Sequence, residues 1–318
     1  MRVSREYEDG VQYLSTDTPL EDMIYLMKRD GAIVVKGLVS EKDIDQATKE
    51  IRLRLDEDLE WEGDFFPKHM IDSKFMIEET RRAPGLIARS PTYTKTNLMN
   101  PIFQALCTHF LTTKNTFWWG DKQKESVSLP YVHSCVAIEI GPGGTAQPLH
   151  RDSYINRNVL DEIDEWDDER DRTRESAMGM LVAGTRITPE NGGTQLIPGS
   201  HLWSTHRKTP PRPEDCIVPT LDKGDALILF ASLYHGGGTN ITNGHRLTLS
   251  CFMVRGYLRQ EENQYLAVPR NVVEQYGVEV QKLIGYSMSD PACGWVEELD
   301  PIFVLHPELA RIQKPQDF

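Results

Sequence analysis

The sequence predicts a mainly β domain, a sandwich or a barrel, with helices around it. The first observation is a change of pattern near residue 132, after which short runs rich in apolar and β-branched residues replace helical periodicity. The second is the turn chemistry between these runs, where glycine, proline and asparagine gather at residues 141–144, 190–193 and 198–200. Short strands with such turns favour a sandwich or barrel over alternating β and α units.

The N-terminal part predicts helices around one buried strand. Residues 23–29 have the pattern of a short helix, and residues 32–35 that of a buried strand. Ser40 is expected to cap a second helix, because a serine side chain accepts a hydrogen bond from a first-turn amide. Apolar residues recur in this second helix at helical spacing: Ile44, Ala47, Ile51 and Leu55.

The β core is expected to contain strands at residues 136–140, 180–187, 226–230 and 247–254. Residues 269–276 are expected to be helical, and residues 291–318 to be irregular and to wrap the core. No repeat or long linker divides the chain. We therefore expect one domain over residues 1–318, with a helical part at about 1–130, the β core at about 131–260 and a C-terminal extension at about 261–318.

Charge and cysteine usage exclude several classes of protein. The chain has 48 acidic against 35 basic residues, a net charge of −13, which opposes binding to nucleic acid or to an anionic membrane. We find neither a run of about 18 apolar residues nor the apolar core of a secretory signal. The five cysteines form no CxxC pair, so we expect reduced thiols and a cytoplasmic protein.

Residues 147–152 (QPLHRD) contain the first candidate metal ligands. His150 and Asp152 are two apart, and on a strand positions i and i+2 point to the same face. Chance alone predicts such spacings in a chain of this composition, and a second match occurs at His306 and Glu308. That match straddles Pro307 in irregular chain, where neither group would be held rigidly, so we do not assign it to a metal.

His235 supplies a third candidate ligand, because it follows the buried run at residues 226–230 and precedes three glycines. Two histidines and one carboxylate on one face of a metal form the triad of non-haem Fe(II) oxygenases. The same ligands could bind zinc in a hydrolase, and a vestigial site in a non-catalytic binding protein is a third reading. Arg246 shares a strand face with Thr248 and Ser250, and its planar fork suits a carboxylate, such as that of a dicarboxylic co-substrate.

These residues, in this order, resemble the phytanoyl-CoA dioxygenase family of Fe(II)/2-oxoglutarate oxygenases. The resemblance rests on residues 139–143 (EIGPG) with the QPLHRD segment, on residues 190–194 (ENGGT) and 197–201 (IPGSH), and on His235 and Arg246. It covers most of the chain, from residues 30–35 to residues 283–286. It implies a jelly-roll core, also called a double-stranded β-helix and shared with cupins.

The resemblance implies roles for individual residues. His150, Asp152 and His235 would hold Fe(II), while 2-oxoglutarate would be bound by Arg246, Gln147 and Arg89. On the expected strand at 180–187, Thr185 lies on the presumed inner face and could offer its hydroxyl to the same acid. The implied reaction uses O2 to convert 2-oxoglutarate to succinate and CO2 while a substrate C–H bond is oxidised. Because Asp152 keeps its carboxylate, we expect hydroxylation, desaturation or a related oxidation rather than halogenation.

Two features of the sequence bear on the class of substrate. An acyl-CoA hydroxylase is one alternative, but the basic cluster around residues 206–212 is short, and the chain does not end in a peroxisomal signal. We therefore favour a small substrate from secondary metabolism, with Tyr154 as a candidate contact if the strand of His150 continues. The acidic stretch 161–175 is expected to be solvated and could lie on the active-site rim. By analogy with the family, we expect a homodimer.

Overall fold

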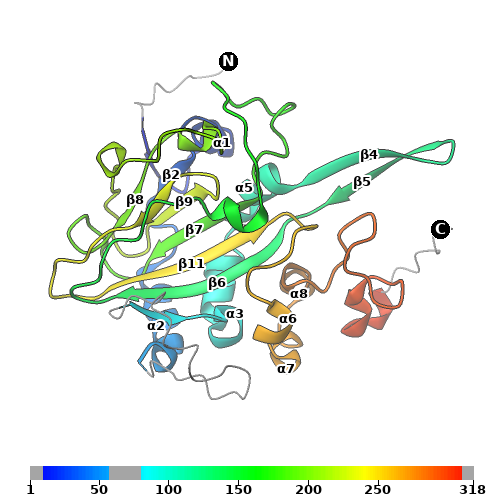
Figure 1. The fold of residues 1–318 in the computed structure, drawn as a ribbon. Coiled ribbons are helices and arrows are strands. Elements are labelled where there is room, and N and C mark those ends of the chain that lie inside the picture. Colours follow the sequence, from blue (N-terminus) through cyan, green and yellow to red (C-terminus); the bar gives the residue numbers. More distant parts are fainter. Residues whose placement is uncertain (1–9, 57–79, 310–318) are drawn as a thin grey trace, which may run out of the picture.

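A seven-stranded sheet organises the protein (Figure 1). The computed structural model describes residues 10–56 and 80–309. The strands follow the spatial order β1-β2-β9-β7-β11-β6-β3. In that order they are Tyr13–Leu14, Ala32–Val35, Ala226–Phe230, Ala177–Ala183, Arg246–Val254, Tyr131–Ile140 and Thr80–Ala83. All pairs in this sheet are antiparallel except β1 with β2, which confirms the predicted mainly β core.

The two faces of this sheet have different partners. On β11, Leu247, Leu249 and Cys251 point into the larger core cluster beneath the helices, whereas Arg246 and Thr248 alternate with them on the opposite, inner face. A smaller apolar cluster on the inner face joins the large sheet to a second, two-stranded sheet. That sheet pairs β8 (Thr194–Leu196) with β10 (His235–Gly237). The inner face between the two sheets is where the candidate site lies.

Helices cover the other face. Helix α1 runs over Leu20–Asp30 and α2 over Glu41–Asp56, followed by α3, α4, a π-helical turn and α5 at Leu86–Arg89, Pro91–Tyr93, Thr94–Leu98 and Pro101–Leu111. Ser40 caps α2 as predicted, since its hydroxyl accepts the amide of Asp43 at 3.1 Å. All four apolar positions predicted for this helix are buried.

The C-terminal part packs beside β6 (Figure 1). It contains α6 (Gln264–Ala267), α7 (Arg270–Val273) and α8 (Val278–Ile284), so the helix expected at 269–276 is shorter than predicted. Single 3-10 turns complete the described chain at Asp152–Asn156, Ser200–Leu202, Pro213–Asp215, Pro301–Val304 and Pro307–Leu309. Within residues 10–56 and 80–309, no helix has both the length and the hydropathy needed to cross a bilayer.

Three expectations about secondary structure were wrong. The part before residue 131 is not only helical, because β4 (Thr113–Trp119) and β5 (Lys122–Ser128) form a hairpin that projects from the domain (Figure 1). The strand expected at 180–187 ends at Ala183, where the chain turns at Gly184 toward Leu247. Residues 147–152 form no continuous strand, because only His150 pairs with a neighbour in ladder fashion.

Candidate metal centre

A single backbone bridge brings the two candidate histidine ligands together. His150 pairs with His235 at the start of β10, and each amide donates to the other's carbonyl oxygen at 2.9 Å. Just before it, the amide of Gln147 donates to the carbonyl oxygen of Gly237 at 2.8 Å. Arg151 is extended, with φ −116° and ψ 129°, so Asp152 returns to the side of His150 although it already begins a 3-10 turn. The side chains of His150 and Asp152 therefore converge as predicted, although the predicted strand is absent.

The three candidate ligands converge on one point. One ligand atom from each of His150, Asp152 and His235 lies within 4.8 Å of the others. The Nε2 atoms of His150 and His235 are both 3.4 Å from Asp152, one from each carboxylate oxygen. Each Nδ1 lies at a backbone carbonyl oxygen instead, that of Pro148 at 2.8 Å and that of Leu233 at 3.0 Å. These bonds fix the rings so that both Nε2 atoms face the carboxylate, as in metal sites whose histidines are oriented by outer partners.

Electrostatics in the cluster favour an ionised carboxylate. Burial opposes ionisation of Asp152, but the charge of His235 and hydrogen bonds from both histidines hold its pKa well below the ordinary value. The hydrogen bond to Asp152 raises the pKa of His150, against the effect of burial. The cluster thus supplies one anionic oxygen and two imidazole nitrogens on one side of a common point. That donor set fits Fe(II) with open coordination positions, and it also fits zinc.

The second spacing match has a structural role. His306 Nε2 is 2.8 Å from Oε1 of Gln281, and its Nδ1 is 3.3 Å from Glu308. Within the part of the chain that the structure describes, the His150, Asp152 and His235 group is the only one of at least three possible ligand residues that could hold a metal ion. The exclusion of His306 and Glu308 from the metal site is consistent with these positions.

Arg246 is buried on the inner face, and no acidic side chain of the described residues pairs with it. Its side chain is at the start of β11 and only 4% exposed. Nη1 donates to Thr248 Oγ1 at 2.7 Å and Nη2 to the carbonyl oxygen of Gly192, while Nε has no hydrogen-bond partner. No acidic side chain pairs with it among the residues of the described ranges. Burial lowers its pKa to about 10, which leaves the group cationic at neutral pH.

Gly192 connects Arg246 to the strand of His235. Its φ is +86°, and a Cβ there would lie 2.8 Å from the carbonyl oxygen of Gly238. Gly238 follows His235 by three residues, which corresponds to roughly 10 Å along an extended chain. A buried cation thus lies a short distance from the cluster of ligands. The sequence indicated Arg246, but it did not reveal that Thr248, two positions along the same face, holds one arm of the guanidinium.

The other predicted contacts have mixed placements. Gln147 is beside the ligands, and its Oε1 accepts the amide of Gly237 at 2.9 Å. Thr185 lies beyond the end of β7, so the strand argument for it fails, and its hydroxyl oxygen accepts the amide of Leu247 at 3.0 Å. Arg89 ends α3, whose Leu86 belongs to the core cluster on the helix-covered face, and its Nε donates to the carbonyl oxygen of Pro84 at 3.0 Å. The backbone of Arg89 therefore lies on the face of the sheet opposite to Arg246.

Tyr154 and the acidic stretch also differ from expectation. Tyr154 is in the 3-10 turn after Asp152 and is 68% exposed, so it does not share the strand parity that supported it. In the acidic stretch, Trp166 stacks on Phe230 with ring centroids 5.3 Å apart, and Asp168 pairs with Lys28 of α1. Both contacts lie on the helix-covered face, so the middle of the stretch does not border the inner face.

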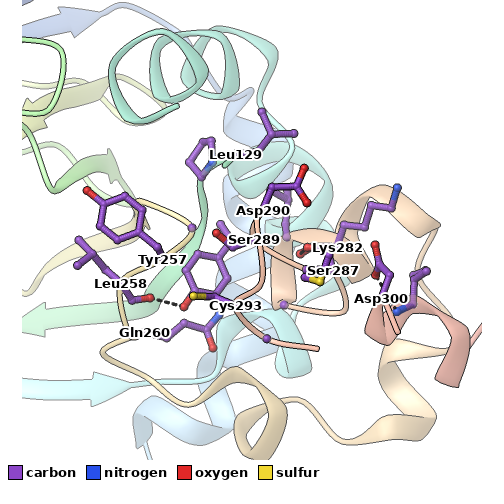
Figure 2. A pocket seen from close by; sticks show the side chains of 18 of the residues that line it. Leu129, Tyr257, Leu258, Gln260, Lys282, Ser287, Ser289, Asp290, Cys293 and Asp300 are labelled. Atoms are coloured by element: carbon purple, nitrogen blue, oxygen red, sulfur yellow. Dashed lines mark hydrogen bonds between the residues drawn. The ribbon is translucent and has the colours of Figure 1, made fainter. Parts of the chain in front are cut away.

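A large cavity lies elsewhere, between the hairpin base, the loop after β11 and the C-terminal extension (Figure 2). It encloses about 740 Å³ and is lined by residues that include Leu129, Tyr131, Tyr257, Leu258, Lys282 and Asp290. None of the three candidate ligands lines it. Tyr131 and Leu258 belong at the same time to a small apolar cluster with Ala177, Ala231 and Val254, and Ala231 accepts the amide of Ser153, next to Asp152. These two side chains thus line the cavity and also pack on the apolar cluster next to the segment of Asp152.

The fold and the cluster define a β-sheet protein of the jelly-roll class with a facial set of two histidines and one carboxylate. The chain belongs to the phytanoyl-CoA dioxygenase (PhyH) family, whose model matches residues 27–248. The chain is 32% identical to the dioxygenase himG of Aspergillus japonicus over 92% of its own length and 89% of that protein. It is 33% identical to the dioxygenase peniF of Penicillium patulum, over 93% and 92% of the two chains. The protein is thus an enzyme, a dioxygenase of this family.

A solved structure shares the fold. The epimerase SnoN, in complex with Fe3+, alpha ketoglutarate and nogalamycin RO, aligns with a TM-score of 0.52 over 76% of this chain and 86% of its own, at 16% identity. At that identity the likeness concerns the fold alone. This likeness, together with the seven-stranded sheet and the β8–β10 sheet that faces it, confirms the predicted jelly-roll core.

Proposed function

We propose that the protein is an Fe(II)- and 2-oxoglutarate-dependent dioxygenase that oxidises a C–H bond of a small organic substrate in secondary metabolism. The observation that carries the proposal is Arg246, a buried cation with a free Nε and no acidic partner within the described residues. It is linked through Gly192 to the segment that follows His235 of the facial triad. A buried charge is costly unless an opposite charge joins it, so this arrangement fits a co-substrate that brings a carboxylate. Activation of a hydrolytic water by zinc does not itself require such a cation.

Each side chain has a definable task in this reaction. His150, Asp152 and His235 would hold the iron, and the carbonyl contacts at Nδ1 keep both rings oriented for it. Arg246 would bind the distal carboxylate of 2-oxoglutarate, with Thr248 holding its guanidinium in place. When bound, Fe(II) supplies the activation of O2 that couples conversion of 2-oxoglutarate to succinate and CO2 with oxidation of the substrate.

Gln147 is a further candidate for co-substrate binding. Its Oε1 is already used by the amide of Gly237, which leaves the side-chain NH2 group as the free donor. Arg89 and Thr185 stay predictions with less support, because Arg89 is on a helix of the other face and the hydroxyl of Thr185 already accepts a backbone amide. Assignment to secondary metabolism is part of the proposal and is supported by membership in this dioxygenase family and by the similarity to himG and peniF. A cytoplasmic location and a homodimer complete the proposal, and free thiols at all five cysteines agree with the former.

The test is anaerobic addition of Fe(II) and 2-oxoglutarate to the metal-free protein. We expect a weak visible charge-transfer band that requires both components, and succinate after air is admitted. Zinc in place of Fe(II) should bind and give no band. Absence of both band and succinate from protein that has bound Fe(II) would contradict the proposed function.

A further inference from the structure

His133 occupies a β-bulge on β6. Along the β6–β11 ladder, Phe252 pairs with Ser134 and Met253 with Val132, so His133 is the extra residue between them. Bulges re-aim a side chain and are frequent beside active sites. In a bulge, two consecutive residues oppose one partner residue, so His133 and Ser134 both stand opposite Phe252. Phe252 lies an even number of residues from Arg246 on β11, so both side chains are on the inner face. His133 is therefore turned toward the side of the metal centre.

The loop after β11 fixes the imidazole of His133 in one orientation. The backbone amide of Glu261 donates to His133 Nδ1 at 3.0 Å, and the amide of Glu262 donates to the His133 carbonyl oxygen at 3.0 Å. Because Nδ1 accepts a hydrogen bond, the proton of the neutral ring is on Nε2. Burial lowers the pKa of His133, against the opposing effect of the Glu261 and Asp152 carboxylates, so the ring is neutral at neutral pH.

The His133 side chain lies on the same side of the sheet as the candidate metal centre. The charge of Asp152 acts on His133, which puts the imidazole within the field of a ligand carboxylate. His133 is only 3% exposed and does not line the large cavity. Its Nε2 has no hydrogen-bond partner among the described residues. Polar atoms of these residues that are both fully buried and without a partner do not include this Nε2, so the atom borders accessible space. Tyr131, two residues before His133 on β6, belongs to an apolar cluster with Ala177, Ala231, Val254 and Leu258.

We propose that His133 is a specificity-determining residue, whose Nε2–H donates a hydrogen bond to a neutral carbonyl oxygen, of a ketone or an amide, on an otherwise apolar substrate. This inference rests on the proposed function and adds the class of substrate to it. The carboxylate of Glu261, whose amide holds the ring, makes this face unfavourable for an anionic acceptor. An apolar wall with one fixed donor discriminates strongly between a ligand with an acceptor and one without, because the donor would otherwise lose its hydrogen bond.

The test measures binding of matched probes to the protein loaded with Fe(II) and 2-oxoglutarate under anaerobic conditions. The probes are alpha-tetralone and dihydrocarbostyril, which carry a ketone and an amide, and the hydrocarbon tetralin, which lacks an acceptor. Perturbation of the charge-transfer band reports binding. We expect at least one carbonyl probe to bind about tenfold more tightly than tetralin, a preference that His133→Leu abolishes. His133→Gln, whose amide nitrogen can donate from nearly the same place, should retain most of it.

Two further measurements separate recognition from a structural role. All variants should keep the 2-oxoglutarate affinity of the parent, and His133→Leu and His133→Gln should lower the melting temperature to a similar extent, because both remove the Nδ1 acceptor of the Glu261 amide. His206→Leu, at an exposed histidine, is the matched control. In the 15N-histidine-labelled protein without metal, His133 should show a protonated Nε2 and an unprotonated Nδ1. Protonation at Nδ1 instead would overturn the proposal.

The outcomes distinguish this inference from the proposed function. A wild-type protein that forms no charge-transfer band contradicts the proposed function itself. A wild-type protein that forms the band, but binds no carbonyl probe or binds tetralin equally well, contradicts only the role of His133. Equal probe affinities in the parent and in His133→Leu lead to the same conclusion.

Discussion

The amides of His150 and His235 donate to each other's carbonyl oxygens, both at 2.9 Å, so one backbone bridge holds the two imidazoles of the metal centre side by side. The ring centroids are 4.8 Å apart. Because the bridge consists of main-chain atoms, substitution of either side chain should leave it in place. The ligand side chains can therefore be tested one at a time without dismantling the site.

Asp152→Ala or His150→Ala should abolish turnover. Each removes a direct ligand, and since changes to outer partners already weaken metal sites by 10–100-fold, we expect Fe(II) affinity to fall by more than about 100-fold. Metal content after gel filtration and anaerobic Fe(II) titration measure this. The matched control is the other spacing match, since His306→Ala and Glu308→Ala should bind Fe(II) normally. Metal loss in those controls would show that our choice of ligands is wrong.

Arg246→Ala should mainly raise the 2-oxoglutarate requirement. Loss of a charged hydrogen-bonding partner for a carboxylate costs roughly 3 kcal/mol, which corresponds to about a 100-fold higher Kd. Arg246→Lys should recover only part of this affinity, because an ammonium cannot reproduce the planar fork. Titration of the charge-transfer band measures the Kd for 2-oxoglutarate, with the exposed Arg212→Ala as control. An unchanged requirement would refute the assignment of Arg246.

Arg246→Met should not destabilise the protein in the absence of co-substrate. The substitution loses hydrogen bonds to Thr248 and Gly192, but it also removes a desolvated cation that has no acidic partner. We expect the free energy of unfolding to stay equal or to rise by about 1–3 kcal/mol. Urea denaturation at neutral pH tests this, with 2-oxoglutarate absent. A loss above about 2 kcal/mol would mean that the charge is already compensated within the fold.

Glu175→Gln should change how stability depends on pH. The carboxylate is fully buried and accepts the hydroxyl and amide of Ser232, and burial raises its pKa from 4.5 to about 7. Between these values the folded state holds a proton that the unfolded state has released, so wild-type stability falls as pH rises through this window. The neutral amide removes this dependence.

At pH 8 we therefore expect Glu175→Gln to be more stable than the wild type by up to about 3 kcal/mol, and at pH 4 to match it. Denaturation curves at several pH values measure the difference. A stabilisation that is the same at both pH values would assign the effect to packing rather than to the charge.

The sequence located the candidate metal ligands by a spacing argument that holds even though the expected strand is absent. Spacing of i and i+2 brings side chains to one side wherever the intervening residue is extended, and Arg151 is extended even though Asp152 begins a turn. The same reasoning failed for Tyr154 and Thr185, because it needed the strands to continue. Where a strand ends depends on its hydrogen-bonding neighbours, which one sequence does not reveal.

Three further features were decided by packing. The backbone of Arg89 lies on the helix-covered face, away from Arg246, because α3 packs on that face of the sheet. The acidic stretch is anchored by Trp166 against Phe230, a contact between distant segments that its charge pattern concealed. The bulge that turns His133 toward the metal side exists only in the register between β6 and β11.

By itself, the sequence determined the mainly β core and indicated the three candidate ligands and the buried arginine, because alternation and short spacings are local properties of the chain. The tertiary structure decided what surrounds them: the bridge between His150 and His235, the absence of an acidic partner for Arg246 among the described residues, and the orientation of His133. Such relationships join segments far apart in the chain. They follow from strand register and burial, which no local pattern specifies.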